Sequence, residues 1–139
     1  MEKLTGLKKI KTAVFISGTG SNLKSLIQFS KLKKSPIVIE MIISNNDKSK
    51  GLRYAKVYKI KKKVFDFKNN SSEKKVIDEL KNNNINLICL AGFMKILSKN
   101  FIKSFKGQIL NIHPSLLPKY KGLNTHEKAI ENKDKYSGC

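Results

Sequence analysis

Three short segments of this chain are apolar almost throughout, and they limit the folds that it can adopt. They span residues 12–17, 37–43 and 86–91. A short, continuously apolar run is typical of a strand in a parallel sheet, because helices cover such a strand on both faces. Parallel strands also need a crossover between them rather than a tight turn. We therefore expect helices between the apolar segments.

Helical patterns do occupy the stretches in between. Apolar residues at helical spacing predict four helices. The first has Leu23, Leu26 and Ile27 on one face, the second carries Leu52 and Ala55, the third has Val76, Ile77 and Leu80 inward, and a short fourth includes Phe101, Ile102 and Phe105. Two shorter strands are predicted at residues 64–65 and 108–110. Ser71 or Ser72 should cap the third helix, and Asn124 should cap a last helix over residues 125–132, with Glu127 at its capping-box position.

The alternation of strand and helix predicts a single α/β domain over residues 1–139, with a Rossmann-like doubly wound, mainly parallel sheet. In such sheets ligands bind beyond the carboxyl ends of the strands. The loops after the first, fourth and fifth strands should therefore meet at one edge of the sheet. Those three loops carry the motifs considered below.

The net charge of +19 suggests nucleic acid as a partner, but the kind of basic residue argues against it. Among 29 basic residues only Arg53 is an arginine, whereas groove readers and phosphate clamps favour arginine. The lysines are scattered along the chain. We expect non-specific attraction to polyanions, no dedicated nucleic-acid function, and a positive field that gathers anionic substrates.

Neither a membrane nor a metal is expected as a partner. No apolar run approaches the roughly 18 residues of a membrane span, and residues 1–9 lack the apolar core of a secretory signal. Cys89 lies in an apolar run and reads as a small buried hydrophobe, and Cys139 is too distant in sequence to form a metal pair with it. A reducing cytoplasm fits this usage.

The first loop, Gly18-Thr19-Gly20-Ser21-Asn22, leaves a strand and enters a helix. Glycines let the backbone approach an anion, and the helix N-terminus can hold it. The loop lacks the third glycine of a dinucleotide site, because Leu23 stands in its place, and it does not match the G-x-x-x-x-G-K-[ST] pattern of a nucleotide P-loop. A phosphate monoester is therefore the ligand that it suits. An ordinary strand-to-helix turn is the alternative.

The other two loops have both a structural and a chemical interpretation. Residues 93–97 follow the fourth strand and could be either core packing or a ligand slot. Asn111 and His113 follow the fifth strand two residues apart, and would share a side if the strand continued. An amide beside an imidazole can stabilise a developing oxyanion and move protons, which suits acyl or formyl transfer. Alternatively, Asn111 caps a turn and His113 is a hydrogen-bonded loop residue.

Together the three segments resemble the folate-dependent formyltransferases, in particular the members that formylate phosphoribosylglycinamide in purine biosynthesis. Within residues 111–120 (NIHPSLLPKY), Asn111 and residues 113–120 match the family's loop as they stand. Residues 16–23 (ISGTGSNL) and 90–97 (LAGFMKIL) resemble its phosphate loop and folate-pocket segment in the same order. The resemblance extends from about Lys11 to the last residue and implies the formyltransferase fold with its C-terminal part missing.

The resemblance assigns a role to each segment. It implies that Gly20, Ser21 and Asn22 bind the substrate phosphate, with backbone N–H groups of Leu23 and Lys24 able to share it. It implies folate contacts from Met94, Lys95, Ile96, Leu97 and Asn111, and catalysis by Asn111 and His113.

The implied activity is formyl transfer from 10-formyltetrahydrofolate to the amine of phosphoribosylglycinamide, without a metal or a covalent intermediate. We expect a cytoplasmic monomer or homodimer. Methionyl-tRNA formyltransferase and formyltetrahydrofolate hydrolase are the alternatives within the family, and a basic nucleic-acid-binding module is the alternative outside it. The early phosphate loop favours the glycinamide substrate.

The chain departs from the family pattern at several positions. Lys95 stands where many relatives have arginine, and a family arginine that contacts folate aligns with Asn69, beside Lys68. A lysine cannot make a planar bidentate contact. A family histidine is replaced by Asn124, while nearby His126 reads as a helix-start residue. The family's aspartate that supports the catalytic histidine would lie beyond Cys139, and Asp134 comes too early to be that residue.

Overall fold

The computed structural model describes residues 8–139, in which strands and helices alternate as the apolar runs predict. The elements are β1 (Ile10–Ile16), α1 (Ser21–Ser30), β2 (Ile37–Ser44), the 3-10 helix η1 (Lys50–Leu52), α2 (Arg53–Tyr58), β3 (Lys61–Val64), α3 (Asn70–Asn82), β4 (Leu87–Leu90), α4 (Lys99–Ser104), β5 (Gln108–Asn111) and α5 (Thr125–Glu131). None of the helices in residues 8–139 is long and apolar enough to cross a membrane.

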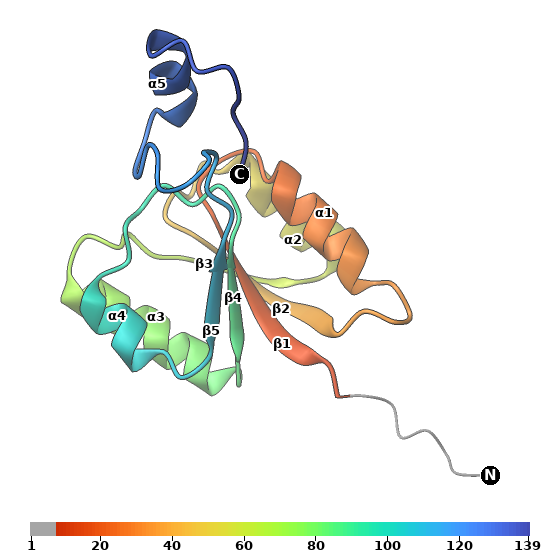
Figure 1. Ribbon diagram of the computed structural model, residues 1–139. Coiled ribbons are helices and arrows are strands. Elements are labelled where there is room, and N and C mark those ends of the chain that lie inside the picture. The colour runs from red at the N-terminus through yellow and green to blue at the C-terminus, as the bar shows by residue number, and fades with distance from the viewer. Residues whose placement is uncertain (1–7) are drawn as a thin grey trace.

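The five strands form one parallel sheet in the order β3-β2-β1-β4-β5. The chain therefore winds outward from β1 in both directions. Helices α1 and α2 cover one face of the sheet, and α3 and α4 cover the other (Figure 1). This arrangement confirms the doubly wound α/β fold. The strand order reverses between β1 and β4, which is where such sheets bind their ligands.

One residue of β2 is out of register with β1. Thr12 pairs with Ile39, but Ala13 pairs with Met41, so Glu40 forms a bulge. A bulge reverses the side-chain alternation of its strand. Ile39 accordingly packs on the α1–α2 face, whereas Met41 packs on the α3–α4 face.

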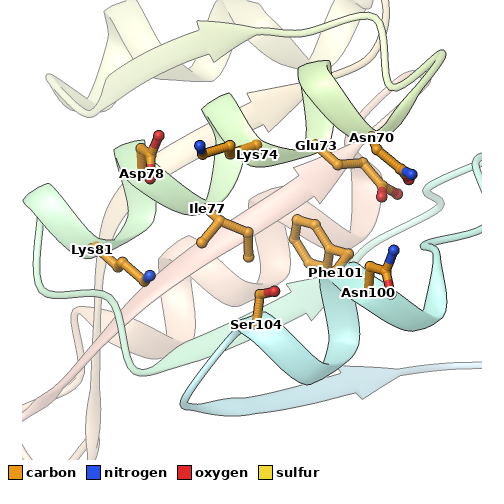
Figure 2. A pocket seen from close by; sticks show the side chains of 9 residues that line it. All are labelled: Asn70, Glu73, Lys74, Ile77, Asp78, Lys81, Asn100, Phe101 and Ser104. Atoms are coloured by element: carbon orange, nitrogen blue, oxygen red, sulfur yellow. The ribbon is translucent and has the colours of Figure 1, made fainter.

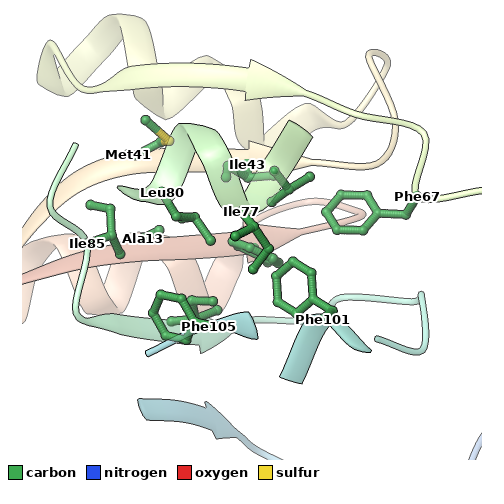
Figure 3. Close-up of a cluster of buried hydrophobic side chains, with 12 residues drawn as sticks. Ala13, Met41, Ile43, Phe67, Ile77, Leu80, Ile85, Phe101 and Phe105 are labelled. Atoms are coloured by element: carbon green, nitrogen blue, oxygen red, sulfur yellow. The ribbon is translucent and has the colours of Figure 1, made fainter. Parts of the chain in front are cut away.

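Each face of the sheet has its own apolar core. On the α1–α2 face, Leu23 and Ile27 pack against alternate residues of the strands. On the α3–α4 face the core is partly aromatic and joins strands to helices (Figure 3). Its centre is Phe15, which is fully buried and has edge-to-face contacts with the rings of Phe67, Phe93 and Phe101 at centroid distances of 5.8, 5.4 and 6.3 Å.

Several local predictions were wrong. The α3 helix is capped by Asn69, whose side chain accepts the Ser72 N–H at 2.9 Å, so Ser72 is the partner in a capping box and not the cap. Asn124 precedes α5 in the left-handed region (φ 56°) and makes no side-chain cap hydrogen bond. The short helix predicted to include Phe101, Ile102 and Phe105 ends earlier, because α4 stops at Ser104 and Phe105 follows it in an extended conformation.

We expect Phe15→Ala to lower the free energy of unfolding by about 3–5 kcal/mol, the usual cost of removing a buried phenylalanine side chain. Phe29, which is 45% exposed on α1, provides the matched control, and Phe29→Ala should cost far less. Urea denaturation of both variants measures the difference. Equal losses would mean that the three-ring contact around Phe15 does not organise the core.

Candidate active site

A cleft of about 510 Å³ lies where the carboxyl ends of β1, β4 and β5 meet. Residues from α1, from the loops after β4 and β5, and from the start of α5 line it: Asn22, Gly92, Phe93, Met94, Asn111, Ile112, His113, Pro114, Gly122, Leu123, Asn124, Thr125, His126 and Glu127. Of the residues that the sequence singles out, the structure thus brings Asn22, Met94, Asn111 and His113 to one cavity.

The loop after β1 turns sharply into α1 at Gly20, which has φ 79°. A Cβ there would lie 2.7 Å from the Gly51 Cα, so the two backbones touch. Gly51 N–H and the Ser49 hydroxyl also donate to Gly18 O, at 3.0 and 2.7 Å. The segment around η1 therefore supports the loop from behind.

The start of α1 offers fewer backbone donors than the sequence suggested. Lys24 N–H donates to Gly20 O at 2.9 Å, as the first intrahelical bond. The N–H groups of Ser21, Asn22 and Leu23 precede that bond and are the donors a helix leaves for an anion. The Leu23 side chain is fully buried in the core, so only its backbone can serve the site.

The loop after β4 is attached to β1 through Ser17. The Ser17 hydroxyl donates to Asn45 Oδ1 at 2.5 Å and accepts the Met94 N–H at 2.8 Å. It thereby connects the loops after β1, β2 and β4. We did not single out Ser17 from the sequence, because it continues the apolar run of β1 and has no pattern of its own.

The predicted folate contacts point to different places. Met94 is 64% exposed and lines the cleft, whereas Ile96 is 96% exposed and Leu97 packs against the α3–α4 core. Lys95 lines a separate hollow together with Lys68. Asn69 lines neither cavity, since its side chain caps α3.

Asn111 is the last residue of β5 and pairs in register with Leu90 of β4. Two residues later the half-buried His113 has its Nε2 2.7 Å from the carbonyl oxygen of Tyr120. The loop from His113 to Tyr120 is compact, because the buried Ser115 hydroxyl donates to Lys119 O at 2.6 Å. Both Asn111 and His113 are thus presented from a folded loop at the edge of the cleft.

The end of the chain lies against the same loop. Asp134 accepts from the Tyr120 hydroxyl at 2.6 Å and from Lys119 Nζ at 2.9 Å, rather than from His113. Cys139 lines a hollow shared with Asn111 and His113. Cys89 is buried, and burial raises the pKa of its thiol.

Another groove, of about 390 Å³, separates α3 from α4 (Figure 2). None of the predicted site residues lines it. The buried Glu73 lies there, and its carboxylate accepts from the backbone N–H and the hydroxyl of Ser98 at the start of α4. Its role is therefore to join two helices. No group of three or more metal-ligating side chains occurs within residues 8–139.

Comparison with known proteins agrees with this architecture. Residues 10–139 match the formyl transferase family, and the chain belongs to that family. It is 46% identical over 136 residues to phosphoribosylglycinamide formyltransferase of Haemophilus influenzae, covering 95% of this chain and 63% of that protein. It is 44% identical over 138 residues to the trifunctional purine biosynthetic protein adenosine-3 of Gallus gallus, covering 94% of this chain and 14% of that protein.

Solved structures show the same fold. The crystal structure of phosphoribosylglycinamide formyltransferase from Brucella melitensis has a TM-score of 0.83 at 38% identity, covering 91% of this chain and 68% of that one. Glycinamide ribonucleotide transformylase 1 from Symbiobacterium toebii has a TM-score of 0.87 at 30% identity, covering 94% and 64% respectively. The chain thus spans under two thirds of several relatives that it matches.

Gly20→Ala should destabilise the protein by about 1–3 kcal/mol, because alanine is strained in the left-handed region and its Cβ would meet the Gly51 backbone. Gly18→Ala is the matched control, since a Cβ at Gly18 would have no atom within 4 Å. Chemical denaturation compares the two variants. A Gly20→Ala protein as stable as Gly18→Ala would refute the close approach of the two backbones.

Proposed function

We propose that this chain contributes the catalytic cleft for formyl transfer from 10-formyltetrahydrofolate to the amine of phosphoribosylglycinamide, in purine biosynthesis. The observation that carries the proposal is the presence of Asn111 and His113 in one cleft with Asn22, at the N-terminus of α1. The cleft thus combines an anion site with an amide and an imidazole. The names of the similar proteins support the choice of substrate.

The start of α1 is the part that suits the phosphate. Three backbone N–H groups precede the first intrahelical bond, and the positive end of the helix dipole adds to their attraction for an anion. Gly20 carries no side chain that would keep a phosphate away. In this proposal Gly20, Ser21 and Asn22 bind the phosphate, with the Leu23 N–H as a further donor, while Lys24 adds only its side-chain charge.

The loop after β4 is the part that suits the folate. A flat ring can bind backbone groups while apolar side chains such as Met94 pack against it. Lys95 and Lys68 line the neighbouring hollow and could attract the carboxylates of the folate tail as point charges, without the planar geometry of an arginine. Asn69 is not assigned a folate contact, because its side chain is engaged at the start of α3.

Asn111 and His113 carry the chemistry in this proposal. The substrate amine attacks the formyl carbon, so a carbon–nitrogen bond forms and negative charge develops on the formyl oxygen. The Asn111 amide and the protonated form of His113, in which both ring nitrogens donate, stabilise that charge. The bond from the formyl carbon to the folate nitrogen then breaks, and the proton lost by the attacking amine is returned to the folate nitrogen with the help of His113. Electrons and protons balance without a covalent enzyme intermediate.

In the full-length protein, His113→Ala should lower kcat by about 10²–10⁴, the usual cost of losing a proton-transferring group or oxyanion donor, while both substrates still bind. Asn111→Ala should also lower kcat and weaken folate binding. Steady-state kinetics and equilibrium dialysis measure these effects. Cys139→Ala is the control, because direct transfer needs no thiol; a comparable loss of rate there would contradict direct transfer.

Because the net charge is +19, the alternative of a nucleic-acid-binding module needs its own test. We expect binding to random duplex DNA to be weak and to vanish as salt is added, since scattered lysines neutralise phosphates without reading bases. A salt titration of fluorescently labelled DNA measures it. Tight, sequence-selective binding that survives added salt would favour a nucleic-acid-binding module over the enzyme.

A further inference from the structure

Tyr120 is in contact with His113 at one end and with Asp134 at the other. Its backbone oxygen lies 2.7 Å from His113 Nε2, and its hydroxyl donates to Asp134 Oδ2 at 2.6 Å. Tyr120 also has a left-handed backbone (φ 52°), which is uncommon for an aromatic residue. A single residue therefore joins the imidazole to a carboxylate fourteen positions further along the chain.

The contact with Tyr120 determines which nitrogen of His113 carries a proton. A carbonyl oxygen can only accept, so the Nε2 that faces it must be the donor. In the neutral imidazole Nδ1 is then the unprotonated nitrogen, and it is the one left to meet a substrate. The same hydrogen bond fixes the orientation of the ring, as in other histidines whose second ring nitrogen is hydrogen-bonded to a backbone carbonyl.

Asp134 is itself held in place by the end of α5. Lys133 adopts the left-handed region (φ 55°), its N–H donates to Ile130 O at 3.0 Å, and the Asp134 N–H donates to Ala129 O at 2.9 Å. This pair of bonds is the Schellman motif that ends many helices. The backbone of Asp134 is thus placed by a helix whose first residues line the cleft.

The charges along this connection suit a stable contact at neutral pH. Hydrogen bonds from the Tyr120 hydroxyl and from Lys119 hold the pKa of the Asp134 carboxyl below its usual value. The same carboxylate raises the pKa of the Tyr120 hydroxyl above its usual value. The carboxylate stays ionised and the phenol stays protonated, so the bond between them is charge-assisted and of the stronger kind.

We propose that Tyr120 and Asp134 are positioning residues for His113: Asp134 holds the Tyr120 ring, and the Tyr120 carbonyl then fixes the orientation and tautomer of the imidazole. The proposal rests on the proposed function for its catalytic consequence, but the orientation of His113 can be observed without any turnover. Neither residue needs to touch a substrate.

The test uses the full-length protein and the variant Tyr120→Phe, which keeps the carbonyl but loses the hydroxyl. In ¹⁵N-edited NMR spectra under mildly alkaline conditions, the unmodified protein should show a His113 Nε2–H signal that exchanges slowly with water; loss of that signal in His113→Gln assigns it. Tyr120→Phe should lose the signal or broaden it. Its kcat should fall about 10- to 100-fold, the scale expected for a misplaced catalytic group, with both KM values nearly unchanged.

Two further variants separate positioning from general stability. Asp134→Asn should weaken the signal less than Tyr120→Phe does, because an amide oxygen still accepts from the hydroxyl, though without the charge. Lys119→Met removes the other partner of Asp134, in an ion pair whose lysine is largely exposed. A pair with an exposed lysine has little energetic weight, so this variant should leave both signal and rate close to those of the unmodified protein. Thermal unfolding of all three shows whether each folds.

The outcomes are distinct. An unchanged Nε2–H signal and unchanged kcat in a folded Tyr120→Phe protein would overturn the positioning role, even if His113→Ala abolishes formyl transfer. Equal effects of Lys119→Met and Tyr120→Phe would also overturn it, because loss of loop stability would then suffice. A signal that responds as expected in a protein without formyl transfer would support the positioning of His113 and reject the proposed function.

Discussion

The pairing of β1 on both of its edges is the constraint on which the other parts of this structure depend. β1 has β2 on one side and β4 on the other, and residues 12–16 within it are fully buried. Its carboxyl end is therefore the least adjustable point of the sheet. The loop that we propose to bind phosphate continues directly from that end, and Ser17 connects the loop after β4 to it through the Met94 N–H. The cleft is consequently built outward from the most rigid strand.

Asn111 depends on β1 indirectly, because its strand β5 pairs with β4 and β4 pairs with β1. β5 pairs with β4 alone in the described residues, and its four residues are at least partly exposed. An edge strand of this kind does not by itself hold the loop that follows it in a fixed position. Residues 113–120 are held instead by hydrogen bonds within the loop and by the contact of Tyr120 with Asp134 after α5. The two sides of the cleft are therefore supported differently: one by the buried strand β1, the other by the hydrogen-bonded loop of residues 113–120.

The sequence was sufficient for the features that depend on regular patterns. The apolar runs at 12–17, 37–43 and 86–91 identified the strands, and the rule that ligands bind at their carboxyl ends brought the three motifs together. What could not be predicted depends on contacts between distant residues. Nothing local marks Ser17 as a link between three loops or Tyr120 as the partner of Asp134. The cap of α3 was misplaced because asparagine and serine compete for the same role within four residues, and the fold decides between them.

The contact between Gly20 and Gly51 places one steric constraint on two segments that are distant in the sequence. Gly51 belongs to η1, which contributes no residue to the cleft, and a Cβ there would meet both Ile16 and Gly20. Each glycine thus restricts the residues that fit at the other position. Neither position can therefore accept a side chain independently of the other. The connection between β2 and α2 would look, in a comparison of relatives, like an ordinary surface crossover. Its length and its glycine are nonetheless constrained by the loop after β1, because any residue inserted near η1 would push against the turn into α1.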